Sequence, residues 1–172
     1  MKLDGNNIYL RAVEPDDIDF LYRLENEGGK EETGFATAPL SRQQLHEYIV
    51  GYSADIHAER QLRLMICSAT DGAAVGTVDI TDYEPRDRRG FVGIAIGAAH
   101  RRKGYGLEAL MILCRYAATT LGMHQLAAMV AVDNEVSRHL FVRAGFKPCG
   151  RLRSWLRRGN TYADALLFQK LF

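Results

Sequence analysis

Residues 94–106 read Ile-Ala-Ile-Gly-Ala-Ala-His-Arg-Arg-Lys-Gly-Tyr-Gly, an apolar run followed by a basic loop that contains glycine. The loop leads into a helix predicted over Gly104–Leu121, in which apolar residues recur at helical spacing and Gly122 follows the C-terminal end. In such a strand–loop–helix unit, successive backbone N–H groups and the positive end of the helix dipole point into one concavity. The stretch therefore predicts an anion site lined by backbone, where Gly104 and Gly106 permit close approach.

The same loop carries three consecutive positive charges. Arg101, Arg102 and Lys103 favour a polyphosphate or a 3′-phosphate as the anion. The sequence has no G-x-x-x-x-G-K-[ST] loop, and it has no G-x-G-x-x-G after a strand of a parallel βαβ unit. The alternative interpretation is a solvated loop in which Gly104 serves only packing.

Upstream of this stretch, the sequence predicts one strand, two helices and three further strands. The first helix opens at Pro15, and the second begins with a capping box formed by Ser41 and Gln44. Thr70-Asp71-Gly72 has the composition of a tight turn, so the strands on either side of it form a hairpin. The predicted elements are a strand at Ile8–Val13, a helix that opens at Pro15, an irregular loop at Glu27–Pro39 and a second helix from Ser41 to about Tyr52. Strands follow at Leu62–Ser68, Ala74–Asp82 and Gly90–Ile96.

Downstream of the long helix, the pattern predicts strand, helix and two strands. Their ranges are His124–Val132, Asn134–Ala144, Phe146–Arg153 and Tyr162–Leu171, the last two joined at Arg158-Gly159-Asn160. The element order is therefore β-α-α-β-β-β-α-β-α-β-β. This order predicts an α/β fold of the α+β type, with a mixed, mostly antiparallel sheet flanked by helices on both faces.

Composition excludes several classes of protein. A length of 172 residues predicts a single domain over residues 1–172, and 47% hydrophobic with 25% charged residues is typical of a chain with a buried core. The net charge of +1 is far from the surplus of a dedicated nucleic-acid binder. Cys67, Cys114 and Cys149 form no C-x-x-C pair, which argues against a disulfide framework or a zinc site and fits a reducing cytoplasm. With no signal-peptide pattern and no stretch of about 18 apolar residues, we expect no membrane span.

Charge is unevenly distributed along the chain. Residues 1–59 contain 12 of the 21 acidic residues and five of the 22 basic residues. This polarity is compatible with a cationic and an anionic ligand bound side by side, or with solubility alone. The acidic residues that could favour a cation include Glu25, Glu27, Glu31 and Glu32.

Three groups of residues carry a resemblance to a known family. Arg101, Gly104 and Gly106 form R-x-x-G-x-G after an apolar strand, which resembles the acetyl-coenzyme A signature of the GNAT superfamily of N-acetyltransferases. The other two groups resemble the branch that holds ribosomal-protein N-terminal-amine acetyltransferases and spermidine acetyltransferases. They are Leu10-Arg11 with Glu14, Pro15 and Asp17, and Asn134-x-x-Ser137 with Ala144-Gly145-Phe146, Gly150, Gly159 and Asp164. The resemblance spans nearly the whole chain but does not specify the amine.

This resemblance implies a GNAT-like fold and a coenzyme site. The strand Gly90–Ile96 is expected to be bulged and to separate from His124–Val132, and the pantetheine arm of the coenzyme fills the gap. Ile94 and Ile96 would contact that arm, and a backbone N–H near Ile96 would polarise the thioester carbonyl. The remaining residues implied in coenzyme binding are Arg101, Arg102, Lys103, Gly104, Tyr105 and Gly106 at the pyrophosphate, Asn134 at the pantetheine arm, and Phe141.

The acceptor amine must lose a proton before it attacks the thioester, because a primary amine with a pKa of about 10.4 is mostly protonated at neutral pH. A carboxylate is the natural acceptor, and Asp79, Asp82 and Glu84 lie on or just after one strand beside the expected gap. Strand alternation places Asp79 and Asp82 on opposite faces, and we favour Asp79 as the catalytic residue. The alternative is that all three are exposed acids at the end of a strand.

The departing thiolate needs a proton donor. Many members of the family place a tyrosine seven residues after the Asn, but here that position is Phe141, which has no hydroxyl. The serine of N-x-x-S is the proposed donor in the N-terminal-amine branch, and Ser137 occupies it, so Ser137 is the expected catalytic acid. A thiol with a pKa near 8.5 is a fairly good leaving group, so a weak acid is sufficient. The alternative is that Ser137 only helps to cap its helix.

The sequence thus predicts a cytoplasmic, acetyl-coenzyme A dependent N-acetyltransferase that needs no metal. It would transfer acetyl directly to a protein N-terminus, a polyamine or a small amine in a ternary complex. One alternative is a catalytically weak acyl-coenzyme A binding module, which the missing hydroxyl at Phe141 keeps open. Another is an RNA- or ribosome-binding protein that uses Trp155 and the arginines of 151–158, although the net charge argues against nucleic acid. Edge strands at the C-terminus leave a homodimer open.

Overall fold

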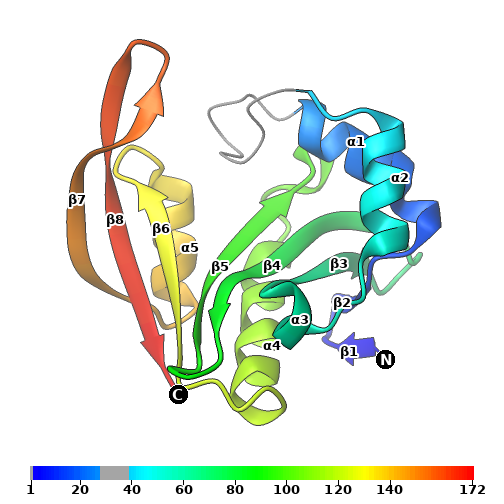
Figure 1. Ribbon diagram of the computed structural model, residues 1–172, viewed down its shortest axis with the longest axis horizontal. Helices are drawn as coiled ribbons and strands as arrows, with labels where there is room; N and C mark the ends of the chain where they lie inside the picture. Colours follow the sequence, from blue (N-terminus) through cyan, green and yellow to red (C-terminus); the bar gives the residue numbers. More distant parts are fainter. Residues whose placement is uncertain (1, 28–38) are drawn as a thin grey trace.

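The computed structural model describes residues 2–27 and 39–172, in which eight strands form one sheet in the order β1-β2-β3-β4-β5-β6-β8-β7 (Figure 1). Neighbouring strands are antiparallel except β5 and β6, which run parallel. The elements are β1 (Lys2–Asp4), β2 (Ile8–Ala12), η1 (Pro15–Asp17), α1 (Ile18–Glu27), α2 (Arg42–Gly51), α3 (Ile56–Glu59), β3 (Leu62–Ser68), β4 (Ala74–Glu84), β5 (Arg89–Ile96), η2 (Ala98–His100), α4 (Tyr105–Thr119), β6 (Gln125–Ala131), α5 (Glu135–Arg143), β7 (Lys147–Arg158) and β8 (Thr161–Leu171).

The predicted α/β fold with a mixed, mostly antiparallel sheet is confirmed, and so is the order of the main elements. The structure adds β1 and α3, two elements of three and four residues that are too short to show a period. Glu27 ends α1 instead of opening the predicted loop, and residues 28–38 of that loop lie outside the described residues.

Local capping explains where the first two helices begin. Arg11 of β2 holds the Asp17 carboxylate by two hydrogen bonds of 2.7 Å, and Asp17 also accepts the Glu14 backbone N–H at 2.8 Å. This pair links the start of α1 to the sheet. The predicted capping box of α2 is present, because Ser41 Oγ accepts the Gln44 N–H at 3.1 Å and Gln44 Oε1 accepts the Ser41 N–H at 2.8 Å.

Helices cover both faces of the sheet, as predicted. On one face, α4 and α5 pack against β2–β6 through a large apolar cluster that includes Val78, Leu110 and Leu126. On the other face, α1 and α2 pack through Leu21 and Leu45 against β3. Successive side chains of β3 and β4 point alternately into the two clusters, so the middle of the sheet is buried on both faces.

The C-terminal hairpin forms an edge of the sheet. Among the described strands, β7 pairs only with β8. Most of its residues are exposed, and the tip of the hairpin extends beyond the other strands (Figure 1). Ser154 has a φ of 47° at an irregularity in the pairing, and its N–H donates to Asp164 at 2.7 Å. Within residues 2–27 and 39–172, no helix is both long enough and apolar enough to span a membrane.

Candidate active site

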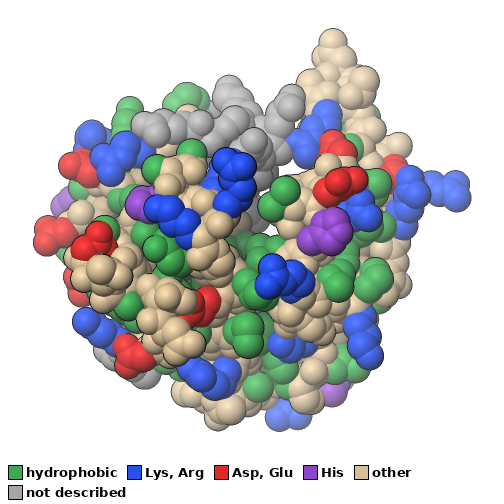
Figure 2. Space-filling model, turned by 180° about the vertical axis from the view of Figure 1, so that it is seen from behind, with side chains coloured by type: hydrophobic (Ala, Val, Ile, Leu, Met, Phe, Trp, Pro, Cys, Tyr) green, Lys and Arg blue, Asp and Glu red, His purple; other side chains and the backbone are tan. Residues whose placement is uncertain are grey.

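Strands β5 and β6 separate after a short paired segment. In the part of the chain that the structure describes, they pair only at Arg89–Phe91 against Gln125–Ala127, so Val92–Ile96 has no strand partner there on that side. The two strands diverge in Figure 1, and Figure 2 shows a hollow between the two parts of the molecule that they separate. The predicted separation is confirmed. The predicted bulge is on the neighbouring strand: the register shifts between Thr81 and Glu84 of β4, while the β4–β5 register stays regular from Phe91 to Ile96.

The backbone of β5 presents polar groups to this gap. The Gly97 N–H donates to the Val75 carbonyl at 2.9 Å, which fixes the direction of alternation along the strand. In an antiparallel ladder, the N–H and C=O of alternate residues point the same way, so those of Ile94 and Ile96 point away from β4 and toward the gap. Arg101 Nε donates to the Ile96 carbonyl at 3.1 Å, and this contact ties the following loop to the end of β5.

The basic loop ends at the N-terminus of α4. Gly104 is the N-cap residue with a φ of 84°, a left-handed conformation that favours glycine, and no side chain of residues 2–27 and 39–172 caps the helix. The first helical hydrogen bond runs from the Glu108 N–H to the Gly104 carbonyl at 3.2 Å, so the N–H groups of Tyr105 and Gly106 have no helical partner. Arg102 and Lys103 are exposed next to these donors. The arrangement fits a phosphate group at the end of the gap.

Asn134 and Ser137 lie at the start of α5, and both are half-buried. Asn134 Oδ1 accepts the Ser137 backbone N–H at 3.0 Å, and this bond caps the helix. The cap uses the backbone of Ser137, so within the described part of the chain the Ser137 hydroxyl and the Asn134 amide NH₂ keep no protein partner. Both groups are therefore available to a ligand.

Phe141 lies in the core, and its contact with the coenzyme stays a prediction. Its side chain is 4% exposed, and its ring packs edge-on against Phe146 at 5.2 Å and stacks on Phe168 at 6.3 Å. Phe141 lies four positions after Ser137, so the helical repeat places the two residues on the same side of α5.

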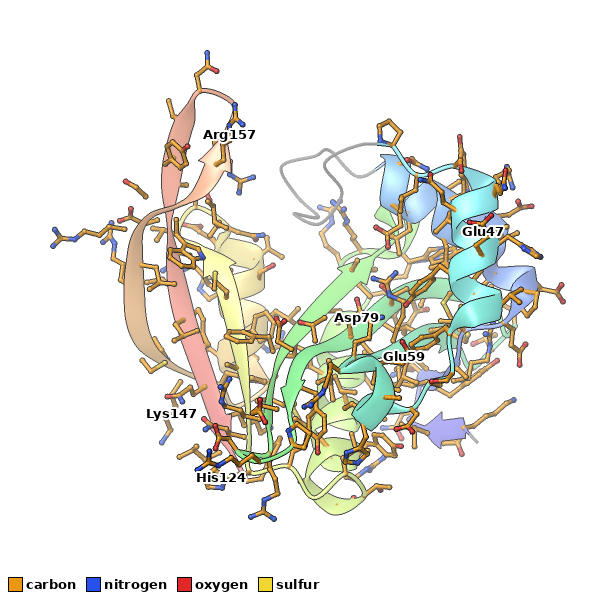
Figure 3. All side chains as sticks on the ribbon, in the orientation of Figure 1. Glu47, Glu59, Asp79, His124, Lys147 and Arg157 are labelled. Carbon is orange, nitrogen blue, oxygen red and sulfur yellow. The ribbon has the colours of Figure 1, made fainter. Side chains whose placement is uncertain are left out.

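Asp79 is the one of the three predicted carboxylates that lies under the helices. Its side chain is on the same face of the sheet as α1 and α2, near the middle of the ribbon in Figure 3. Asp82 is exposed in the bulge, and Glu84 accepts the Arg86 N–H at 3.2 Å. Burial raises the pKa of Asp79, and the positive charge of Arg63 opposes this rise.

Arg63 is the residue of this region that the sequence interpretation missed. It holds both oxygens of Asp79, and its Nη1 contacts Glu25 Oε1 at 3.0 Å. Its backbone N–H donates to Tyr52 Oη at 2.6 Å, and its guanidinium lies 5.7 Å from the centre of the Tyr48 ring. Tyr48 and Tyr52 stack at 5.5 Å, and burial raises the pKa of Tyr48 to about 12 against the opposing charge of Arg63.

Of the other acidic residues predicted to favour a cation, Glu31 and Glu32 lie outside the described residues, and the side chain of Glu27 is not described. On the C-terminal hairpin, Arg151 pairs with Asp164 at 2.6 Å. Trp155 is exposed on β7. In the described ranges, no group of three or more His, Cys, Asp and Glu side chains could hold a metal ion.

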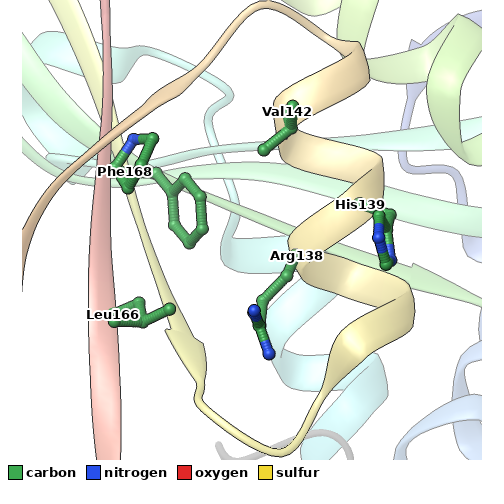
Figure 4. A pocket seen from close by; sticks show the side chains of 6 residues that line it. Arg138, His139, Val142, Leu166 and Phe168 are labelled. Atoms are coloured by element: carbon green, nitrogen blue, oxygen red, sulfur yellow. The ribbon is translucent and has the colours of Figure 1, made fainter.

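A separate pocket of about 180 Å³ lies between α5 and the C-terminal hairpin (Figure 4). Its lining is largely apolar, and Val142, Leu166 and Phe168 contribute to it. Arg138 lines it as well, but its Nη1 donates to the Val132 carbonyl at 2.9 Å. None of the predicted site residues lines this pocket, so it is distinct from the gap between β5 and β6.

Residues 7–147 match the acetyltransferase (GNAT) domain family. The uncharacterized N-acetyltransferase YoaA of Bacillus subtilis is 27% identical over 128 residues, which cover 74% of this chain and 72% of YoaA. The spermidine N(1)-acetyltransferase of Vibrio cholerae is 26% identical over 160 residues, covering 93% of this chain and 90% of that protein.

A solved structure shows the same fold. The spermidine N-acetyltransferase from Vibrio cholerae in complex with CoA and spermine superposes with a TM-score of 0.86 at 24% identity, covering 97% of this chain and 96% of that chain. The family match spans most of the chain and includes the β5–β6 gap and the start of α4. The chain belongs to the GNAT acetyltransferase family, and it is an N-acetyltransferase that uses acetyl-coenzyme A.

Proposed function

We propose that this chain transfers the acetyl group directly from acetyl-coenzyme A to a primary amine while both substrates are bound. The observation that carries the proposal is the position of the β5–β6 gap, which opens beside the N-terminus of α4. The N-terminus of α4 offers backbone N–H groups to a diphosphate. The edge of β5 at the gap offers backbone N–H and C=O groups to an extended arm. Acetyl-coenzyme A supplies the acetyl group as an activated thioester.

On the coenzyme side, each group of this chain has a separate task. The backbone N–H groups of Arg101–Gly106 bind the pyrophosphate, with added attraction from Arg102 and Lys103. The backbone groups of Ile94 and Ile96 pair with the pantetheine arm, and the N–H near Ile96 polarises the thioester carbonyl. The Asn134 amide NH₂ donates to the same arm.

On the leaving-group side, Ser137 donates a hydrogen bond or a proton to the departing thiolate. Its hydroxyl is not used in capping α5, so it is available at the start of this helix. Phe141 cannot replace it, because its ring is buried and carries no hydroxyl. Alignment of amine and thioester then supplies much of the rate enhancement, on the order of several kcal/mol.

On the acceptor side, we propose a cationic amine that binds near the ion-paired cluster of Glu25, Arg63 and Asp79. This cluster contains two carboxylates and one guanidinium on the α1–α2 face. The relatives support this choice, since the spermidine N(1)-acetyltransferase of Vibrio cholerae is similar in sequence, and a structure of the spermidine N-acetyltransferase from the same organism contains spermine. A polyamine or a small aliphatic amine is therefore our first candidate, and a protein N-terminus is the second.

We further propose that residues 1–172 form one acetyltransferase domain and that the chain self-associates. The single continuous sheet of the described residues supports the first point. The exposed edge strand β7 supports the second, together with a dodecameric structure of the Vibrio cholerae spermidine N-acetyltransferase. Sedimentation of the purified chain tests the assembly, and a monomer at all concentrations would contradict it.

Thiol release from acetyl-coenzyme A tests the proposed reaction. The acceptors are spermidine, butylamine and peptides that begin with Ala or Ser, each assayed with wild type and Ser137→Ala. We expect amine-dependent thiol release by the wild type. Release at the blank rate with every acceptor, in a protein that binds coenzyme A, would contradict catalysis and favour a binding module. Salt-sensitive binding to RNA in the absence of coenzyme would favour the nucleic-acid alternative.

A further inference from the structure

The ion-paired cluster on the α1–α2 face consists of three side chains from three elements. Arg63 of β3 lies directly opposite Asp79 of β4 in the strand register. Arg63 Nε donates to Asp79 Oδ1 at 2.9 Å and Nη2 donates to Oδ2 at 3.1 Å, while Nη1 donates to Glu25 Oε1 of α1 at 3.0 Å. The side chain of Arg63 is 22% exposed, and those of Asp79 and Glu25 are each 13% exposed. The cluster is therefore mostly removed from water.

The charges of this cluster do not balance. Two carboxylates share one guanidinium, so one negative charge remains when both acids are ionised. Asp79 has both oxygens bonded by Arg63, whereas Glu25 uses only Oε1. Among the described residues, Glu25 Oε2 has no partner. A largely buried carboxylate that lacks a partner for one oxygen favours the binding of a cation.

Arg63 is held in a single orientation by its surroundings. Its backbone N–H is fixed by Tyr52 Oη, and the Tyr48 ring lies beside the guanidinium. Two hydrogen bonds to Asp79 orient the plane of the guanidinium, which aims Nη1 at α1. Asp79 therefore influences Glu25 through Arg63, although the two carboxylates share no hydrogen bond.

The position of Glu25 is set by the path of α1 over the sheet. Near the start of this helix, Phe20 Cε2 lies 3.7 Å from the position that a Cβ would take on Gly97, at the end of β5. Five residues later, Glu25 reaches the cluster at Asp79, whose register partner on β5 is Gly93. Phe20 thus lies beside the end of β5, and Glu25 lies over β3 and β4 at the level of Gly93 in the strand register. At that level, among the described residues, β5 has no strand partner on the side of the gap, and there we place the thioester.

We propose that Glu25 contacts the ammonium group of the acceptor, and that Arg63 and Asp79 are positioning residues that hold the Glu25 carboxylate. The assignment rests on the proposed function and refines it, because Asp79 then acts through Arg63 and does not touch the substrate. Glu25 Oε2 accepts a hydrogen bond from the ammonium group, and the reacting nitrogen passes one proton to solvent water before its lone pair attacks the thioester. Binding of the amine supplies the positive charge that the cluster lacks.

The first test replaces Glu25 by Gln, which keeps the size of the side chain and the bond to Arg63 but removes its charge. The matched control is Glu47→Gln on α2, an exposed glutamate bonded to Gln43 (Figure 3). We expect Glu25→Gln to raise KM for spermidine and butylamine about tenfold or more, and to leave kcat and the Kd of coenzyme A within about twofold. Glu47→Gln should leave all three values unchanged. An unchanged KM in Glu25→Gln would overturn the assignment.

The second test asks whether Asp79 acts through Glu25. Asp79→Asn should raise KM for the same amines, and the double variant Glu25→Gln/Asp79→Asn should have a KM no higher than Glu25→Gln alone. Arg63→Lys, which keeps the charge but loses the fork of donors, should raise KM by an intermediate factor. Independent, multiplicative effects of Glu25→Gln and Asp79→Asn on KM would overturn the positioning role. If Asp79→Asn fails to fold, the Glu25→Gln and Arg63→Lys results decide alone.

Calorimetry separates this inference from the proposed function. With coenzyme A bound, the wild type should bind spermidine or butylamine, and Glu25→Gln should bind them more weakly. If the wild type binds coenzyme A but neither amine, the Glu25 assignment is wrong and the coenzyme site stands. If the wild type does not bind coenzyme A, the proposed function itself is wrong.

Discussion

The Asn134 side chain accepts the Ser137 backbone N–H at 3.0 Å, so the residue that caps α5 is Asn134 and the hydroxyl of Ser137 is not needed for the helix. The N-x-x-S pattern alone leaves open whether Ser137 caps the helix or donates a proton, and this hydrogen bond assigns the cap to Asn134. It also makes the catalytic role of Ser137 testable without damage to the fold.

Ser137→Ala should lower kcat about tenfold or more, because the departing thiolate loses its hydrogen-bond donor. The melting temperature should stay close to that of the wild type, since the capping bond uses the backbone. Steady-state thiol release and thermal unfolding measure the two effects. Thr119→Ala, at the opposite end of α4 from the proposed site, is the control and should change neither. A wild-type kcat in Ser137→Ala would show that Ser137 is not the donor.

Gly104→Ala should weaken coenzyme A binding and destabilise the protein. Gly104 has a φ of 84°, so a Cβ there costs about 1–2 kcal/mol, although no other described part of the chain comes within 4 Å of that Cβ. Gly159→Ala is a matched control, because Gly159 has a φ of 58° and equally open surroundings at the hairpin tip. Urea unfolding should show a similar decrease in the free energy of unfolding for both variants. Calorimetry should show an increased Kd for coenzyme A only for Gly104→Ala. Equal Kd values would mean that this loop does not bind the coenzyme.

Phe141→Tyr should not restore a missing acid. The ring is 4% exposed and packs against Phe146 and Phe168, and an unpaired buried hydroxyl costs about 1–3 kcal/mol. We expect a lower midpoint of urea unfolding and no increase in kcat. A rise in kcat at unchanged stability would show that the position faces the thiolate after all.

Stability at high pH should depend on Tyr48. Burial raises its pKa to about 12 from an ordinary value of 10.0, with Arg63 acting in the opposite direction. The stabilising contribution is complete below about pH 10, where the tyrosine is protonated in both states, and it is lost as the pH rises through about 12, because the unfolded chain deprotonates first. In Tyr48→Phe, the free energy of unfolding should fall less steeply over this range. Urea unfolding at several pH values measures the difference, and identical slopes would contradict this account.

Local patterns predicted most of the fold. The capping box at Ser41 and the turn at Thr70-Asp71-Gly72 depend on neighbouring residues, so the sequence alone identifies them. The bulges at Asp82 and Ser154 were not predicted, because positive φ values at non-glycine residues depend on the surrounding sheet. The short elements β1 and α3 are likewise held by contacts with distant residues.

The part of the candidate site that the backbone forms could be proposed from sequence alone. Gly104, Ile94 and Ile96 were proposed from a strand–loop–helix pattern and a resemblance, and their contact with the coenzyme stays a prediction. The Arg63–Asp79 pair could also have been found, since a hairpin centred on Asp71 places these residues opposite each other. The contact of Glu25 with Arg63 could not, because it depends on how α1 packs over the sheet.

The central claim is that the β5–β6 gap and the N-terminus of α4 bind coenzyme A. Titration of coenzyme A into the isotopically labelled protein, followed by amide NMR shifts, tests this claim most directly. The account predicts the largest shifts at Ile94, Ile96, Gly104 and Gly106. Shifts confined to the α5 pocket around Val142 and Phe168, or no shifts at all, would contradict it.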